Sequence, residues 1–259
     1  VSRQSLDGGA DALRPGCGWL PSDGMPVAIL RRAARAAANG AEASLTDYGP
    51  ARGSLPLRGL LARRFAAEGL EIGPERILLT SSGTQGLDLV CRFLLQPGDT
   101  VVLDDPCYFN FQALLLAHCV RIVGVPMTPA GPDMERFAQI LAAHRPRLYV
   151  TNSAIHNPTG ASLSPQTAHR ILLLVARHDT TIVEDDILAD FEPEPSPRLA
   201  VLDGLARVVR IGSFSKTFAS NGGFIAVRDR ATAEYLKYYS ATHTFSNALS
   251  PVQAATVLK

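Results

Sequence analysis

Residues 121–152, RIVGVPMTPAGPDMERFAQILAAHRPRLYVTN, contain two short apolar runs on either side of a helical pattern. The outer runs, RIVGV (121–125) and RLYVTN (147–152), are typical of strands that are buried on both faces. Residues 133–144 between them repeat apolar side chains at helical spacing. A strand, a helix and a second strand in this order predict an α/β fold with a mainly parallel sheet.

The same alternation extends from about residue 76 to residue 214. It predicts one large domain, residues 71–259, in which helices sandwich the sheet. The further expected strands are RILLT (76–80), TVVLDD (100–105), TTIVEDD (180–186) and VVRIGSF (208–214), and the further helices are 84–95 and 165–179. Residues 1–70 differ, with helices near 26–39 and 54–68 around the turn-rich DYGPARG, and we interpret them as an N-terminal arm.

Composition and charge narrow the class of protein. The chain has 259 residues, 46% of them hydrophobic, and a formal net charge of +1. These values suit a globular protein with a sizeable core and predict no nucleic-acid binding by this chain. The sequence has no apolar run of membrane-spanning length and no signal-peptide core. Cys17, Cys91, Cys107 and Cys119 form no CxxC pair, which favours buried thiols without a metal site. We therefore expect a soluble, cytoplasmic protein.

Polar segments follow four of the predicted strands directly. Ligands of open α/β sheets bind beyond the carboxyl ends of the strands, so these segments are expected to meet in one pocket. They are SSGTQG (81–86), SAIHNPTG (153–160), the end of TTIVEDD at Asp185, and SFSK (213–216).

Each segment has an ordinary structural interpretation and a chemical one. SSGTQG suits either a helix N-cap or a phosphate site of backbone N–H groups, and HNPTG alone is good turn chemistry. Asp185 belongs to an acidic pair at a buried strand end, which needs solvent, a cation or a capping role. Lys216 follows a buried strand closely, and desolvation would lower its pKa and make it a nucleophile toward carbonyls. A Schiff-base lysine, an aspartate for a pyridinium nitrogen and a phosphate cradle together indicate pyridoxal phosphate.

The motifs resemble those of a known family. The chain is similar to fold-type I, aspartate-aminotransferase-like pyridoxal-phosphate enzymes (class I/II). The similarity is greatest to kynurenine/aminoadipate-type aminotransferases and to the aminotransferase-like domains of MocR-like GntR regulators. The resemblance runs from about Leu13 to the end, through YGPARGSLPLR, TSSGTQGLDLVCRFLLQPGDTVVLDDPCY, NPTG, VEDDILADF and SFSKT in that order.

The resemblance implies a role for each matched residue. Lys216 would hold the cofactor as a Schiff base and then shuttle the proton, and Asp185 would keep the pyridine nitrogen protonated. Asn157 would donate to the phenolic oxygen, and Tyr108 would stack on the ring. Core packing remains the alternative for the two tyrosines. The implied phosphate ligands are Gly83, Thr84, Gln85, Ser213, Ser215 and, from a second subunit, Tyr48.

Three departures from the family pattern stand out. Leu188 occupies the place of a tyrosine that also contacts the phenolic oxygen. The stretch ASNGGF lacks the phosphate-binding arginine, so either the site has no such ion pair or the sequence skips residues near 220–223. The chain stops at SPVQAATVLK, and we expect the C-terminal small domain with its carboxylate-binding arginine to be absent.

Two functions remain open. The first is an aminotransferase that moves an amino group between an amino acid and a 2-oxo acid, as a homodimer with the cofactor near the subunit interface. The second is the cofactor- or amino-acid-sensing domain of a MocR-like transcription regulator, which a winged-helix segment upstream of Val1 would indicate. Decarboxylase, lyase or acyl-transfer chemistry on the same scaffold is a third possibility, because a fold does not determine a reaction.

Overall fold

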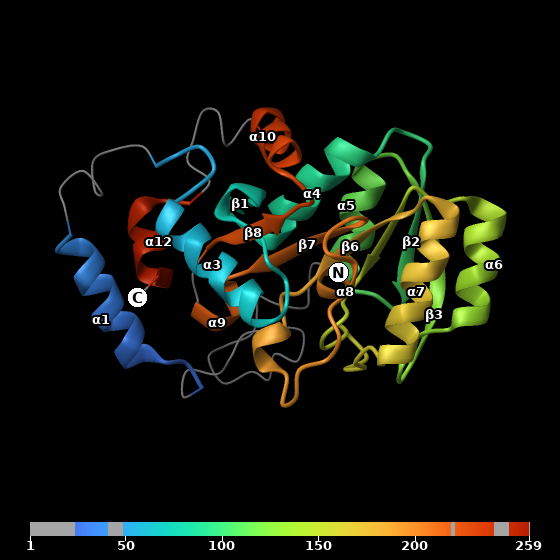
Figure 1. The fold of residues 1–259 in the computed structure, drawn as a ribbon, viewed down its shortest axis with the longest axis horizontal. Coiled ribbons are helices and arrows are strands. Elements are labelled where there is room, and N and C mark those ends of the chain that lie inside the picture. The colour runs from blue at the N-terminus through green and yellow to red at the C-terminus, as the bar shows by residue number, and fades with distance from the viewer. Residues whose placement is uncertain (1–23, 41–48, 219–220, 241–248, 259) are drawn as a thin grey trace, which may run out of the picture.

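The computed structural model describes residues 24–40, 49–218, 221–240 and 249–258, and Figure 1 shows helices on both faces of a central sheet. Within these ranges eight strands form one sheet in the order β1-β8-β7-β6-β5-β2-β3-β4. They are β1 (Ile77–Thr80), β2 (Thr100–Asp105), β3 (Arg121–Thr128), β4 (Gly131–Pro132), β5 (Leu148–Thr151), β6 (Thr181–Asp185), β7 (Val208–Ser213) and β8 (Gly223–Ala226). The expected α/β fold with a mainly parallel sheet is confirmed.

The direction of the strands determines where the polar segments emerge. Strands β3, β2, β5, β6 and β7 are parallel neighbours in the sheet. Strand β8 lies between β7 and β1 and is antiparallel to both. β1 therefore points the same way as β7, and the carboxyl ends of β1, β7, β6, β5 and β2 share one edge of the sheet.

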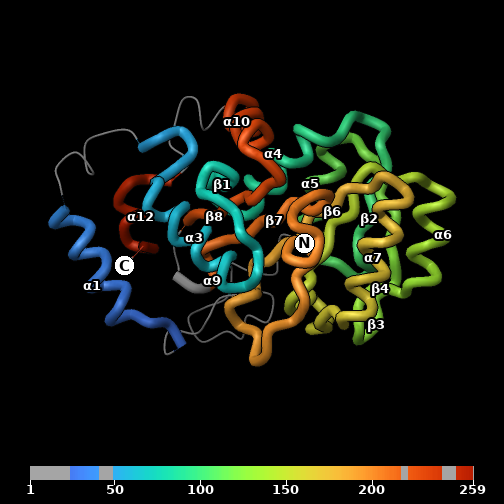
Figure 2. Tube along the Cα trace, in the orientation of Figure 1, coloured from blue at the N-terminus to red at the C-terminus, as the bar shows by residue number. Residues whose placement is uncertain are grey.

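Helices cover both faces of the sheet with separate apolar clusters. One face packs against α4 (Gly83–Leu94), α5 (Phe109–Ala117) and α10 (Arg230–Tyr239). The other packs against α3 (Leu55–Ala67), α6 (Met134–His144), α7 (Pro165–His178), α8 (Leu199–Asp203) and α12 (Pro251–Leu258). α1 (Val27–Ala38) lies alongside α12 at the end of the molecule in Figures 1 and 2. The short α9 (Ser215–Phe218) follows β7.

Several helices begin where short polar side chains cap their first turn. Ser82 accepts from the backbone N–H of Gln85 at 3.0 Å, and Asp133 accepts from Arg136 at the same distance. Ser164 caps α7 by accepting from Thr167 at 3.1 Å. Each bond satisfies an N–H group that has no partner within its helix, so the sequence pattern located these starts to within a residue or two.

Some elements have no counterpart among the sequence predictions. α5 reads FNFQALLLA, which is apolar on all sides and so carries little helical periodicity. β8 is four residues long and begins at the second residue of the Gly222-Gly223 pair, which favours a turn. α8, α10 and α12 were likewise not predicted. The sequence patterns therefore did not predict the antiparallel strands β4 and β8 of this sheet.

The N-terminal region is joined to the sheet through α3. Leu57, Leu61 and Phe65 of this helix are buried in the same cluster as strand residues Ile77 and Leu79. The boundary near residue 70 stays a prediction.

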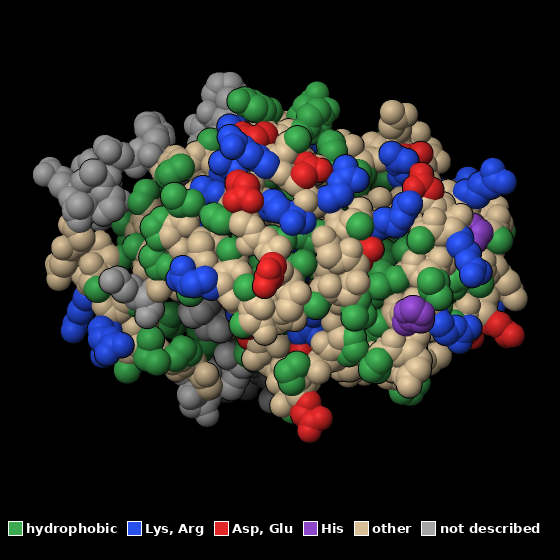
Figure 3. Space-filling model, viewed as in Figure 1, with side chains coloured by type: hydrophobic (Ala, Val, Ile, Leu, Met, Phe, Trp, Pro, Cys, Tyr) green, Lys and Arg blue, Asp and Glu red, His purple; other side chains and the backbone are tan. Residues whose placement is uncertain are grey.

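The surface charges agree with the composition, but of the described cysteines only Cys91 is buried, while Cys107 is half-buried and Cys119 exposed. On the face in Figure 3, Lys and Arg side chains are interspersed with Asp and Glu. No helix in the described part of the chain is long and apolar enough to cross a membrane. Cys91 is a buried free thiol as expected, whereas Cys119 is exposed because it lies in the turn after α5. Cys17 lies outside the described residues.

Candidate active site

The start of α4 and the end of β7 are in direct contact. A Cβ atom placed on Gly83 would lie 3.4 Å from the Cβ of Ser213. The backbone N–H of Gly222 donates to the carbonyl of Ser81 at 2.8 Å, and the Ser213 and Ser215 hydroxyls are 2.9 Å apart. The two predicted phosphate segments therefore form one polar surface at the N-terminus of a helix.

Within this surface, SSGTQG acts as a helix cap. Besides the bond from its backbone N–H to Ser82, Gln85 accepts through Oε1 from the Ser81 N–H at 2.7 Å and from the Ser81 hydroxyl at 2.9 Å. The side chain of Gln85 is thus folded back on its own loop, while Thr84 is exposed at the helix start. The capping interpretation is correct, and it leaves the helix N-terminus available to an anion.

Lys216 lies in the turn directly after this polar surface. It is half-buried in the first turn of α9, one residue beyond Ser215. Its position follows from the length of β7, which ends at Ser213 beside Gly83. The lysine is therefore placed at the carboxyl edge of the sheet, next to the hydroxyl groups.

Asp185 and Asp186 lie at the end of β6 and have opposite surroundings. Asp185 is 8% exposed, and its Oδ1 accepts from the Ile187 N–H at 3.2 Å. Burial, and to a lesser degree the charge of Asp186, raise the pKa of Asp185 to about 7. A buried carboxylate of this kind would gain from a positively charged partner.

Asp186 already has such partners. Its Oδ2 accepts from Arg210 Nε at 2.9 Å, and its Oδ1 lies 2.8 Å from Arg198 Nε. Arg210 also reaches Glu68 at 2.6 Å, and its guanidinium lies 4.5 Å from the centre of the Phe65 ring. The two members of the acidic pair therefore have different surroundings, and Asp186 is the one that lies in a cation-rich network.

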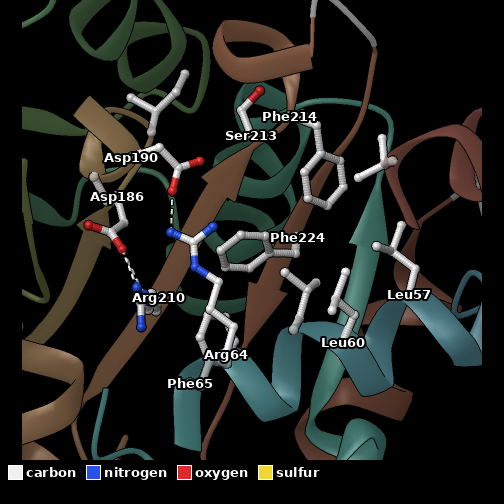
Figure 4. Close-up of a pocket in the computed structure, with 14 residues that line it drawn as sticks. Leu57, Leu60, Arg64, Phe65, Asp186, Asp190, Arg210, Ser213, Phe214 and Phe224 are labelled. Atoms are coloured by element: carbon white, nitrogen blue, oxygen red, sulfur yellow. Dashed lines mark hydrogen bonds and ion pairs between the residues drawn. The ribbon is translucent and has the colours of Figure 1, made fainter. Parts of the chain in front are cut away.

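A small cavity adjoins this network. It measures about 80 Å³ and lies between α3, β7 and β8, and Ser213 is part of its lining. Figure 4 shows Arg210 reaching Asp186 and Arg64 reaching Asp190 across it, with Phe65 and Phe224 on its apolar side. Each of the labelled charged groups is paired with another, which makes the cavity a poor site for an ion.

Tyr108 lies at the end of α5 that faces the same edge of the sheet. It is half-buried, its ring stands edge-on to Phe111 at 5.6 Å, and its hydroxyl accepts from Asn110 at 2.9 Å. Burial raises the pKa of Tyr108, the Asn110 hydrogen bond lowers it, and the negative charge of Asp185 raises it further.

Asn157 belongs to a loop that is tied to β6. Asn152 donates to the backbone carbonyl of Asp185 at 3.0 Å, and Ser153 donates to the buried carboxylate of Glu184. Asn157 is half-buried further along this loop. Sequence reasoning did not single out Asn152 or Ser153, although their position directly after an apolar run was a signal that could have found them.

The structure describes two of the places at which the sequence departs from the family pattern. Leu188 is half-buried before the short 3₁₀ turn Ala189–Phe191 and offers no hydroxyl. A Cβ on Gly223 would lie 2.6 Å from the Gly212 carbonyl and 2.8 Å from the Gly83 nitrogen, so no side chain fits at that position. Residues 219–220 and Tyr48 lie outside the described residues.

Comparison with known proteins defines the class to which the chain belongs. The profile of the aminotransferase class I and II family matches residues 19–259, and the chain belongs to this family. A 2-aminoadipate transaminase of Thermus thermophilus is 32% identical over 179 residues, which is 67% of this chain and 44% of that protein. The uncharacterized HTH-type transcriptional regulator YdfD of Bacillus subtilis is 29% identical over 212 residues, covering 81% and 43%.

Solved structures agree on the fold. LysN, an alpha-aminoadipate aminotransferase of Thermus thermophilus complexed with N-(5'-phosphopyridoxyl)-L-leucine, superposes with a TM-score of 0.83 at 26% identity, over 93% of this chain and 62% of that one. An aspartate aminotransferase of the same organism gives a TM-score of 0.78 at 25% identity, covering 89% and 63%. The aspartate-aminotransferase-like fold is confirmed. The chain spans less than half the length of the two curated relatives named above.

Proposed function

We propose that this chain is the cofactor-binding part of a pyridoxal-phosphate-dependent aminotransferase, which transfers an amino group between an amino acid and a 2-oxo acid. Membership of the aminotransferase class I and II family supports the reaction class. The observation that carries the proposal is the buried carboxylate of Asp185, which shares a sheet edge with Lys216 and with the contact between Gly83 and Ser213.

The donor set fits the chemical groups of this cofactor. The helix N-terminus at Gly83 and the hydroxyls of Ser213 and Ser215 suit a phosphate. Asp185 suits a protonated ring nitrogen, because a cation beside it would stabilise its buried charge. Tyr108 offers a flat aromatic face at the start of α5, which follows β2 at the same edge of the sheet.

Lys216 has few competitors for covalent attachment. The sequence contains three lysines, at positions 216, 237 and 259, among 25 basic residues. Lys237 lies on α10, 3.0 Å from the Glu234 carboxylate and 4.4 Å from the centre of the Tyr238 ring. Lys216 is the lysine that follows β7 at the edge of the sheet.

When bound, pyridoxal phosphate supplies a ring that withdraws electrons and stabilises negative charge at the substrate's α-carbon. Asp185 would hold the proton on the ring nitrogen, and Asn157 would donate to the phenolic oxygen. Lys216 Nζ would carry the proton between the α-carbon and the carbon that receives it. Gly83, Thr84, Gln85, Ser213 and Ser215 would anchor the phosphate and so fix the ring against Tyr108.

Borohydride reduction tests the covalent attachment. Protein supplied with pyridoxal phosphate is reduced, digested and mapped, and the label is expected on the peptide that contains Lys216. Lys237→Arg is a matched control that should retain the label. Label on another lysine, or none on folded protein, would contradict the proposal.

The second candidate function is a sensing domain of a MocR-like regulator, in which the same site binds the cofactor or its amino-acid adduct as a signal. The HTH-type relative from Bacillus subtilis favours it. The complete open reading frame distinguishes the two functions: an upstream winged helix with sequence-specific DNA binding supports the regulator, and its absence with rapid amino-group transfer supports the enzyme.

The proposal includes a cytoplasmic homodimer, in which Tyr48 of one subunit reaches the phosphate of the other. The family to which the chain belongs supports this assembly. Sedimentation equilibrium together with the cofactor affinity of Tyr48→Phe tests it. A monomer that binds the cofactor with unchanged affinity would contradict it.

A further inference from the structure

A buried polar cluster outside the predicted site residues lies under the loop that carries Asn157. Its centre is Asp104 of β2, which is 2% exposed. Asp104 accepts from the Tyr149 hydroxyl at 2.6 Å through Oδ1 and from the Thr151 hydroxyl at 2.7 Å through Oδ2. Both donors belong to β5, so this carboxylate joins the ends of two neighbouring strands.

His156 completes the cluster from the loop side. The residue is 2% exposed, and its Nδ1 lies 2.7 Å from the Thr159 hydroxyl. Its Nε2 lies 3.3 Å from Asp104 Oδ2 but makes no hydrogen bond in this geometry. A buried polar nitrogen without a hydrogen bond is costly, and the charge of Asp104 is the compensation within reach.

The backbone of His156 closes the same loop. Its N–H donates to Ala161 at 2.8 Å, and its carbonyl accepts from the N–H of Gly160 at 2.7 Å. Asn157 is the next residue after His156, and Tyr108 follows Asp104 by four positions. The cluster therefore connects the chain segments that carry these two candidate cofactor contacts.

The surrounding chemistry favours a carboxylate at this position. Burial and the negative charge of Asp104 raise the pKa of Tyr149, so its hydroxyl remains a hydrogen-bond donor over the physiological pH range. Tyr149 and Thr151 both present donors, and an imidazole N–H would be a third. An amide at position 104 would offer its NH₂ group to one of these donors and leave it without an acceptor.

We propose that Asp104 and His156 form a positioning pair, which holds the loop 156–161 against β2 and thereby sets the position of Asn157. The proposal rests on the proposed function only for the role of Asn157. Neither residue touches the expected cofactor, and both act through the loop.

Hydrogen exchange of the cofactor-free protein tests the pair directly. In Asp104→Asn and His156→Leu, the exchange of the Gly160 N–H is expected to accelerate about tenfold, because each change removes the buried electrostatic contact between His156 Nε2 and Asp104. His156→Gln keeps an N–H that can reach Asp104, so it should restore much of the protection. Val175→Ala on α7, a core substitution of comparable cost, should leave Gly160 unchanged. Unchanged exchange in both His156→Leu and Asp104→Asn would overturn the proposal.

The visible absorbance of the bound cofactor tests the link to Asn157. His156→Leu is expected to shift the spectrum in the direction of Asn157→Ala, and the double variant should add no further shift, because both changes act on one contact. An additive shift, or none with the cofactor bound, would overturn the link. Wild-type protein that binds no cofactor would refute the proposed function, and the exchange of Gly160 would still confirm or refute the pair.

Discussion

Two adjacent carboxylates at the end of β6, Asp185 and Asp186, lie in different environments. Asp186 lies among Arg210, Arg198 and Phe65, in a network where positive and negative groups face one another at 2.6 to 2.9 Å. Asp185, one residue earlier, is also buried, and desolvation together with the charge of Asp186 raises its pKa to about 7. The carboxylate of Asp186 is balanced by ion pairs, whereas Asp185 is the carboxyl group that the proposed function assigns to the cofactor.

This difference has a physical basis. Side chains alternate between the two faces of a strand, so consecutive residues at a strand end point to opposite sides. One side of β6 packs against the helices that include α3, and the other faces the cluster that includes α4 and Tyr108. A single residue shift of β6 would exchange the two environments and would bury Asp185 among the arginines.

The largest expected effect is on amino-group transfer at the proposed cofactor site. Lys216→Ala should reduce amino-group transfer by at least about 10³-fold, because it removes both the attachment point and the group that moves the proton. Lys237→Ala is the matched control and should keep activity within about threefold, since Lys237 pairs with Glu234 on α10 and is not at the carboxyl edge of the sheet. Steady-state and single-turnover assays measure both variants. Retained transfer in Lys216→Ala would show that the site lies elsewhere.

The second largest effect is expected on stability, when the ion-pair network around Asp186 is disrupted. Arg210→Met should lower the free energy of unfolding by about 3–5 kcal/mol, because it leaves Asp186 and Glu68 without their shared partner in a buried setting. Arg207→Met removes an exposed ion pair with Asp179 and should cost about 0–1 kcal/mol. Urea unfolding of the cofactor-free proteins measures both. Equal costs for the two variants would mean that the buried network contributes no more than a surface pair.

Asp185→Asn should have a smaller effect that depends on pH. The folded protein raises the pKa of Asp185 to about 7, so folding binds a proton between about pH 4 and pH 7 and stability falls as pH rises through this window. The asparagine variant does not titrate there. Without cofactor it should be more stable than the wild type at pH 8, by on the order of 1–4 kcal/mol, with little difference near pH 4.

The same variant should bind pyridoxal phosphate more weakly, so stability and binding should change in opposite directions. Unfolding midpoints at pH 4.5, 6 and 8, with and without cofactor, measure both effects. Asp186→Asn serves as the control, because it is expected to destabilise the protein at pH 8. A wild type whose stability relative to Asp185→Asn does not change with pH would refute the assigned environment of Asp185.

The smallest effect is expected on cofactor affinity, at the contact between Gly83 and Ser213 where the phosphate is proposed to bind. Gly83→Ala places a Cβ 3.4 Å from that of Ser213, so it should weaken cofactor binding by about threefold to tenfold, equivalent to roughly 0.7–1.4 kcal/mol. Gly59→Ala, on α3 with a Cβ 3.7 Å from the Arg63 side chain, should leave binding unchanged and stabilise its helix slightly. Fluorescence titration distinguishes the two, and equal affinities would place the phosphate away from Gly83.

Sequence patterns located the elements that have strong periodicity or clear caps. The helix after Ser82 and the helix after Ser164 begin where capping residues precede amphipathic segments. Patterns failed for α5, which is apolar on all sides, and for β8, which has four residues. The acidic pair was expected to need solvent, a cation or a capping role. The arginines that pair with Asp186 come from β7 and from residue 198, and no local sequence pattern connects them to it.

The sequence by itself determined the α/β fold class, the family and the order of the motifs, because these depend on residue types at short spacing along the chain. Only the tertiary structure decided that β8 inserts between β1 and β7, which brings Gly83 to Ser213. It also decided which of two consecutive aspartates meets arginines and that Asp104 lies beneath His156. These contacts join residues that are far apart in sequence, and strand order and register, which depend on the packing of the whole sheet, bring them together.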